Sequence, residues 1–468
     1  MEVTPGRDGR GVSPVVAGHS RISAAAVFGL LLCGRAAGQP QHSPPPFLPQ
    51  RADEDYRYLQ DAARRGDPLD VLKYIPFGEG GYATVGGEIR ERYEYFRNGG
   101  WGRDPADGNG YLLQRYMLHV DVHAGSRFRF FGQLKSGVAS GRNGGPRPPD
   151  EDRLDVQQAF LDIKLDGVQL RAGRQELSFG SSRLVSFREG PNVRQSFDGV
   201  RVGWEQAKWR VDIFAVKPAE TGRGIFDDSP DHTRSFWGVY ATRPHVDIYY
   251  LGLDRKRARF AAGTEREQRH SVGTRVWGRV QSWDYNGEAV WQWGRFGAGG
   301  IRAWTVASDT GYRFGAAPLH PRLGLKADIA SGDANSGDRT LGTFNALFPR
   351  GSYFSEADLL GPYNLTDLHP SVELQPASSW KIAPEADFFW RASTSDGIYG
   401  IPGNLIHSGQ GTTARYVGMH AGLSAEWRRD RHTSITGMYL HFFPGAFLHE
   451  APPGRNVNFV AIWLTYKF

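Results

Sequence analysis

The sequence predicts an all-β protein, a transmembrane antiparallel β-barrel of about 18 strands with long extracellular loops and short periplasmic turns. Apolar and polar residues alternate along most of the chain, with the period that places neighbouring side chains on opposite faces of a strand. The mean hydropathy is −0.48, and no apolar run reaches the roughly 18 residues that a membrane-spanning helix needs. Aromatic residues make up 13% of the chain and glycines number 60, which is typical of a barrel between lipid and water.

The first residues have the features of a secretory signal peptide. Arg21 precedes an apolar run at 22–32, and small residues follow at 36–38. This order predicts a signal peptide over residues 1–38, cut near Gly38. Cys33 is the single cysteine, so no disulfide forms within the chain. Lipidation of Cys33 is the less favoured alternative, because a large leucine precedes it.

Two further regions follow the signal peptide. Residues 39–66 are Pro-rich and then polar, and we expect them to form a periplasmic N-terminal segment. Within this segment, residues 53–66 predict one short polar helix. Residues 67–468 form the expected barrel domain, and we place residues 67–76 at its periplasmic entrance.

The alternation is regular from residue 82 onward. Val85 and Ile89 share one face of the first predicted strand, while Glu88 and Arg90 share the other. The same pattern recurs to the end of the chain. We predict strands at 82–97, 111–124, 126–138, 154–166, 168–177, 196–205, 207–217, 234–243, 245–254, 268–279, 282–293, 298–308, 320–330, 371–378, 380–391, 415–427, 431–442 and 456–468.

A soluble β-sandwich also alternates, so two further features decide between these classes. The polar face is charged along its whole length, and Trp and Tyr gather near strand ends, as in the aromatic girdle of a membrane barrel. The even number of segments suits closure, because an open sheet edge in lipid would leave backbone groups unpaired. The last strand alternates up to Phe468, which is typical of a strand that closes an outer-membrane barrel.

The connections alternate in length. Short ones at 125–126, 166–167 and 243–244 predict periplasmic turns, and long ones predict extracellular loops. The longest, at 331–370, is expected to fold inward or over the mouth of the barrel. The expected long loops are 139–152, 178–195, 218–233, 331–370 and 393–414.

The strip at 170–185 lies within a predicted strand that is interrupted by a turn. We expect a strand from Val168 to Leu177, a break at 178–180, and a resumption at Arg183. Because the strip carries arginines on an extended backbone, we interpret it as part of a pore wall.

Short motifs are spread from residue 67 to the end of the chain. They are DPLDVLKYIP (67–76), GEIR (87–90), GRQE (173–176), RLV (183–185), FDG (197–199), FWG (236–238), YYLG (249–252), SGD (331–333), TFN (343–345), LFP (347–349), FWR (389–391) and FF (442–443). Their order and spacing are more specific than any one of them, and together they resemble the alginate-export family of outer-membrane proteins. The resemblance implies a monomeric barrel of about 18 strands that passes an acidic exopolysaccharide through an arginine-rich constriction.

Arginines account for 47 of the 56 basic residues. A guanidinium group presents a planar fork that binds a carboxylate through two hydrogen bonds, although a GC-rich genome that encodes Arg in place of Lys is an alternative explanation. Fixed cations inside a barrel replace the hydration of an anionic polymer and exclude cations. The candidate pore and substrate-binding residues are Arg90, Arg92, Arg115, Arg129, Lys135, Arg174, Arg183, Arg275, Arg279, Arg322, Lys326 and Arg391.

Each of these cations has a second interpretation, in which it pairs with an inward acid and braces a wide lumen. For any one arginine taken alone we favour such pairing, and for the set we favour a net basic constriction. The acids that alternation places inside are Glu88, Glu94, Asp121, Asp284, Glu288 and Asp387.

The sequence contains no GxSxG motif, no P-loop and no Rossmann glycine pattern. We therefore expect no enzymatic activity and no cofactor. The acidic loop at 331–338 departs from the EF-hand pattern, so no metal site is expected, and Asp333 and Asp338 are the weak candidates for calcium ligands.

These observations predict an outer-membrane channel of a Gram-negative bacterium for an alginate-like polysaccharide or a related acidic solute. The first alternative is a substrate-specific porin that takes up small acidic or aromatic solutes, and a barrel-borne hydrolase is the second. We expect a monomer in contact with outer-membrane lipids, with periplasmic secretion proteins as further candidate partners. Nucleic acid is not an expected partner, because the net charge of +6 is spread through the strands.

Overall fold

The computed structural model describes residues 45–106, 108–335 and 337–468. The predicted signal peptide and the start of the Pro-rich segment lie outside the described residues. In the described part of the chain, no helix is long and apolar enough to cross a membrane.

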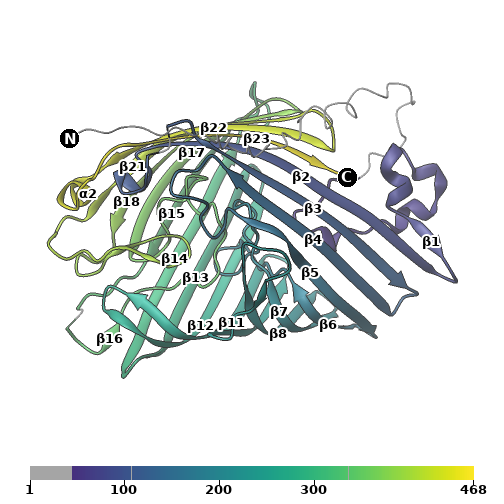
Figure 1. The fold of residues 1–468 in the computed structure, drawn as a ribbon, viewed down its shortest axis with the longest axis horizontal. Coiled ribbons are helices and arrows are strands. Elements are labelled where there is room, and N and C mark those ends of the chain that lie inside the picture. The colour runs from purple at the N-terminus through teal and green to yellow at the C-terminus, as the bar shows by residue number, and fades with distance from the viewer. Residues whose placement is uncertain (1–44, 107, 336) are drawn as a thin grey trace, which may run out of the picture. The chain divides into compact units, whose positions relative to one another are not determined.

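The described chain forms a closed antiparallel barrel of 18 strands, which confirms the predicted fold class (Figure 1). Each strand pairs with its successor along the chain, and the first pairs with the last through Glu88 and Lys467. Every predicted strand coincides with an observed one, with ends that differ by a few residues. The strands are β2 (Gly81–Arg97), β3 (Tyr111–Ala124), β4 (Phe128–Ser140), β5 (Asp152–Leu165), β6 (Val168–Gln175), β7 (Phe197–Gln206), β8 (Trp209–Glu220), β10 (Arg234–Arg243), β11 (Val246–Phe260), β12 (Gly263–Val280), β13 (Trp283–Phe296), β14 (Gly299–Arg313), β15 (Arg322–Ala330), β17 (Leu365–Ala377), β18 (Trp380–Arg391), β21 (Tyr416–Arg428), β22 (Thr433–Pro444) and β23 (Val457–Lys467).

Short elements lie before the first of these strands or in the connections between them. They are β1 (Ile75–Phe77), β9 (Ser229–Pro230), β16 (Thr340–Leu341), β19 (Ile398–Tyr399), β20 (Leu405–His407), α1 (Gly99–Gly102) and α2 (Ala446–Glu450). The short turns gather at one end of the barrel, which we call the short-turn end, and the long loops gather at the other.

The alternation of side chains separates an apolar outer face from a charged inner face. On β4, Phe130 and Leu134 are exposed on the outside, while Arg129 and Lys135 are buried inside. This is the inverse of a soluble protein, because here the outer face meets lipid and the backbone groups satisfy each other around the closed sheet.

The N-terminal segment differs from its prediction. In place of one helix over 53–66, it forms three short 3-10 helices, Arg51–Asp53, Arg57–Gln60 and Ala62–Arg64. The prediction of one helix is wrong because the chain is extended at Glu54, after the buried anchors Arg51 and Ala52, and again at Asp61, after the buried Leu59. The barrel fixes the segment at these anchors, and this overrides its helical tendency.

Residues 67–77 attach this segment to the barrel. The 3-10 helix Pro68–Leu72 begins with a capping box, in which the Asp67 side chain accepts from Leu69 N at 2.8 Å and Asp70 binds the backbone at Asp67. The strand β1 then pairs with the start of β2. The short helices and β1 therefore lie at the short-turn end (Figure 1).

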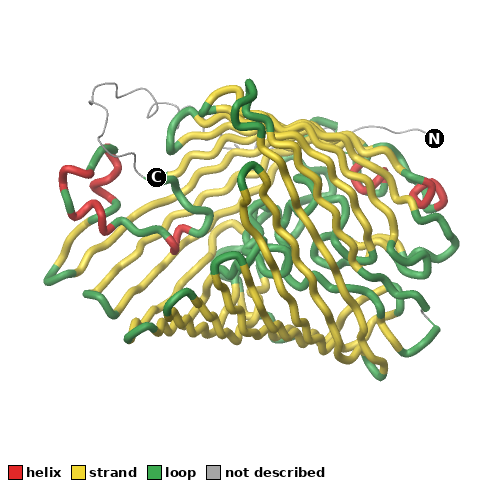
Figure 2. The backbone as a smooth tube through the Cα atoms, turned by 180° about the vertical axis from the view of Figure 1, so that it is seen from behind, coloured by secondary structure: helices red, strands yellow, loops and turns green. Residues whose placement is uncertain are grey.

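Two long loops enter the lumen. Residues 176–196 follow β6, and residues 331–364 follow β15. Val185 forms a parallel β-bridge with Phe348, whose N–H donates to Leu184 O at 2.9 Å. Figure 2 shows loop segments within the ring of strands, and the inward fold predicted for the longest loop is observed.

The strip at 170–185 is a strand for only part of its length. β6 ends at Gln175, so the prediction that the strand resumes at Arg183 as barrel wall is wrong. Phe179 is buried and stacks on Tyr240 with ring centroids 4.8 Å apart. Burial of apolar residues inside the lumen therefore draws the chain away from the wall after β6.

Because the outer face is apolar, a charge placed there should destabilise the barrel, and the loss of stability should depend on the depth of the residue in the membrane. Leu161 and Leu165 share the outer face of β5 and are 60% and 61% exposed. We expect Leu161→Arg, near mid-membrane, to reduce the free energy of unfolding by about 2–4 kcal/mol, and Leu165→Arg, at the turn, by about 0–1 kcal/mol. Urea titration in lipid vesicles measures both, and equal losses would contradict the predicted membrane position.

Candidate functional site

The lumen is the candidate site, and its charged residues form compact groups. At the centre of one group, Arg115 Nε donates to Glu88 Oε1 at 2.9 Å, and its Nη2 lies 2.6 Å from Glu189 Oε1. Arg90 donates to the carbonyl oxygens of Glu189 and Pro191 at 3.1 and 2.9 Å. Two predicted pore arginines from neighbouring strands therefore hold the same stretch of the loop at 176–196.

That loop contributes its own arginine to the group. Arg194 is almost fully buried and pairs with Glu88, Glu176 and Glu189. Burial raises the pKa of Glu176, which lies just beyond the end of β6, to about 7. Sequence reasoning missed Arg194 because it lies in a predicted loop, and alternation carries no signal there.

The loop at 331–364 meets the wall in the same way. Arg92 pairs with Glu94 at 2.6 Å and with Glu356 of this loop at 2.7 Å. Arg269 on β12 donates to Thr343 O at 3.1 Å. Arg183, in the first inward loop, lies 3.4 Å from Asp328 on β15. The two loops are therefore fixed to several sides of the wall by guanidinium groups.

The short-turn half of the lumen holds a further group. Arg129 pairs with Asp121 at 2.7 Å and lies 3.5 Å from Asp162. Arg171, which the predicted set omits, pairs with Asp162 at 2.7 Å and lies over the Phe160 ring. Its alternation with the exposed Leu170 is the signal that could have identified it.

A cavity of about 810 Å³ opens in this half of the lumen. Residues of the wall strands and of the N-terminal segment line it together. Its basic lining residues are Arg57, Arg129, Lys164, Arg171, Arg201 and Arg210, and its acidic ones are Asp53, Glu54, Asp55, Glu205 and Asp212.

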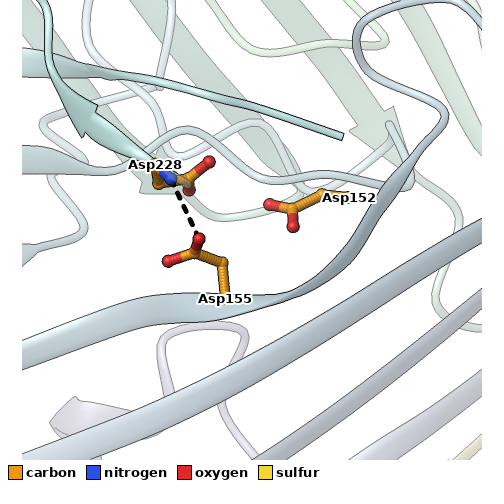
Figure 3. Close-up of side chains that lie close together, drawn as sticks. All are labelled: Asp152, Asp155 and Asp228. Atoms are coloured by element: carbon orange, nitrogen blue, oxygen red, sulfur yellow. Dashed lines mark hydrogen bonds between the residues drawn. The ribbon is translucent and has the colours of Figure 1, made fainter. Parts of the chain in front are cut away.

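Three aspartates cluster near the long-loop end. Asp152, Asp155 and Asp228 each offer an oxygen within 4.8 Å of the others. Figure 3 shows the three side chains converging, with Asp228 N donating to Asp155 at 3.0 Å. The Lys135 ammonium lies 2.7 Å from both Asp152 and Asp228, and Arg174 lies 3.7 Å from Asp155 and Asp228. Side-chain cations of the protein thus occupy the position that a metal ion would take.

Among the described residues, the calcium candidates Asp333 and Asp338 join no such cluster. Asp333 is buried and accepts from Asn335 N at 3.2 Å, whereas Asp338 is exposed and accepts from Thr340 N at 2.7 Å. Each carboxylate therefore caps its own turn.

The remaining predicted cations are dispersed. Arg275 pairs with Asp247 at 3.0 Å, and Arg322 pairs with Asp284 and Asp309. Arg391 is fully buried and donates to loop carbonyls, including Asp396 O at 2.9 Å. Within the described residues, the side chains of the exposed Arg279 and the half-buried Lys326 form neither an ion pair nor a hydrogen bond. The structure thus brings Arg90 to Arg115 at the loop 176–196, and Lys135 to Arg174 at Asp228.

Residues 81–461 match the family model described as alginate export. The chain belongs to the alginate export family. The match covers the barrel from its first strand to its last. A search of curated proteins finds no match.

Solved structures share the barrel at low sequence identity. Acinetobacter baumannii OccAB1 is 11% identical with a TM-score of 0.56, and the alignment covers 86% of this chain and 99% of that one. Pseudomonas aeruginosa OpdK with vanillate is 11% identical with a TM-score of 0.55, covering 82% and 98%. Pseudomonas aeruginosa OccK2 (OpdF) in complex with glucuronate is 11% identical with a TM-score of 0.54, covering 84% and 99%. The family and the porin-like fold support an outer-membrane channel, in preference to an enzyme.

The aspartate cluster predicts that calcium stabilises the folded protein once Lys135 is removed. Lys135→Met removes the ammonium and leaves the buried Asp152 and Asp228 without it, so we expect the free energy of unfolding to fall by about 3–5 kcal/mol in chelator. Calcium should restore part of this loss, because carboxylate oxygens are its preferred ligands.

Urea titrations with and without calcium measure both effects. Lys164→Met is the control, since Lys164 is exposed at the short-turn end. A calcium response of the same size in both variants would show that the cluster does not bind the ion.

Proposed function

We propose that this barrel conducts an anionic, alginate-like polysaccharide or a related acidic solute across the outer membrane through an arginine-lined lumen. The proposal rests on one observation: the wall arginines take many of their hydrogen-bond acceptors from the inward loops and not from the wall itself. Arg90, Arg92, Arg115 and Arg269 are on wall strands, but many of their acceptors belong to the two inward loops. When a loop withdraws, its arginine stays on the wall and needs another acceptor.

The carboxylates of a uronate polymer can serve as this replacement acceptor. A guanidinium binds a carboxylate more strongly than a neutral carbonyl, because the bond is charge-assisted and can be bidentate. Successive wall arginines then offer many exchangeable sites, and conduction requires that no single site hold the polymer tightly. In this proposal the short-turn end faces the periplasm and the long loops face the exterior.

A second candidate function is the uptake of small acidic solutes. It is favoured by the size of the lumen cavity, about 810 Å³, which lies within the range typical of small-ligand sites. It is also favoured by two solved structures of the same fold, one with vanillate and one in complex with glucuronate. The same arginines would serve either cargo, so the length of the permeating anion distinguishes the two.

Single-channel recording in a planar bilayer tests the proposal. We expect a reversal potential that shows anion preference under a salt gradient, because fixed guanidinium groups line the path. Polyuronate added to one side should block the current, while a neutral dextran of matched length should not. Block by monomeric glucuronate without block by the polymer would favour the small-solute porin. Cation preference would contradict both.

A further inference from the structure

The N-terminal segment does more than cover the short-turn end, because part of it lies inside the barrel. Ala52 is buried and packs in one apolar cluster with Phe131 and Phe160. These phenylalanines face the lumen, since their neighbours Phe130 and Leu161 are exposed on the outer face. Contact with Phe131 and Phe160 therefore places Ala52 in the lumen.

Arg51 fixes the segment at this depth. Its Nη1 donates to Gly87 O in β2 at 2.9 Å, and its Nη2 donates to Phe468 O at the end of the chain at 2.8 Å. A third bond within the segment joins Nε to Glu54 Oε1 at 2.8 Å. The side chain thus ties the segment to both strands at the seam where the barrel closes.

A nearby part of the wall, two strands from β2, holds the same stretch. Arg129 on β4 donates to Ala52 O at 2.5 Å, in addition to its ion pair with Asp121. The segment is therefore attached to the lumen wall at two places, through Arg51 at the seam and through Arg129 on β4.

The tip of the segment reaches the first inward loop. Arg194 donates to Pro49 O at 3.2 Å, and Gln50 Nε2 donates to Glu176 O at 3.4 Å. From the short-turn end inward, the lumen thus contains the N-terminal segment, then the loop at 176–196, then the loop at 331–364 that contacts it.

We propose that residues 48–60 form a plug, inserted from the periplasmic end, that closes the lumen at rest and withdraws for transport. The proposal rests on the channel function and adds a gate to it. The plug lines part of the 810 Å³ cavity, so its withdrawal joins that cavity to the space below the inward loops.

The hydrogen bonds that hold the plug can be replaced by bonds to an acidic solute. The bonds that hold it to the wall run from Arg51 and Arg129 to neutral backbone carbonyls. A carboxylate is a stronger acceptor for a guanidinium than a carbonyl is. An acidic solute that enters from the periplasm therefore competes with the Ala52 carbonyl for Arg129, and with the wall carbonyls for the plug's own Arg51.

Bilayer recording in potassium chloride tests the plug without any cargo. We expect deletion of residues 45–60 to raise the mean current severalfold over the full chain. Arg51→Ala should raise it partway, because it removes the bonds to Gly87 and Phe468. Arg64→Ala is the matched control in the same segment, since Arg64 is exposed and pairs only with Asp61 among the described residues.

A synthetic peptide of residues 45–60, added to the side of the short turns, should restore closure of the deleted channel and have no effect from the other side. Heat-dependent gel mobility shows whether each variant contains a folded barrel. A folded deletion variant with unchanged current would overturn the plug. Anion selectivity and polyuronate block, recorded on the same channels, report on the proposed function separately.

Discussion

The cost of burying guanidinium groups inside a barrel determines how the rest of the chain is arranged. A charge moved out of water loses several kcal/mol of solvation unless partners replace the water. The lumen of this barrel contains buried arginines from many strands, among them Arg90, Arg115 and Arg269. Their donors have to be satisfied by carboxylates or by backbone carbonyls.

The wall alone does not supply enough acceptors, and the connections supply the rest. Arg115 finds Glu88 on the neighbouring strand, but it also uses the carbonyl of Glu189 in the loop at 176–196. Arg129 finds Asp121 and also uses the carbonyl of Ala52. Loops and the N-terminal segment are thus drawn into the lumen, and burial of apolar residues such as Val185 and Phe348 stabilises them there.

The strands were predictable because their signal is local and repeated. Alternation placed Arg90, Arg115, Arg129 and Lys135 on the inner face without any tertiary information, and all are buried inside. The partners of these residues were less predictable. Glu356 and Asp228 lie far along the chain from Arg92 and Lys135, and they meet only because the barrel closes and the loops fold inward.

The same reason explains where the predictions were wrong. The strip after Gln175 continues a plausible strand pattern, yet apolar contacts inside the lumen take it off the sheet. The polar run at 53–66 has a helical composition, yet its anchors to the barrel divide it into short turns. Ala52 carries no sequence signal of its role, because a small residue in a polar segment gives no indication of the phenylalanines that it meets.

The central claim is that the lumen is closed at rest by chain segments that the wall arginines hold. Maleimide labelling of a single cysteine at Ala52, with Cys33 replaced by serine, tests it most directly in the refolded protein. Ala52 is 5% exposed, whereas Ala63 lies in the same segment and is exposed. The account predicts slow labelling of Ala52→Cys and fast labelling of Ala63→Cys, with the difference lost in the Arg51→Ala background. Equally fast labelling of both cysteines would contradict it.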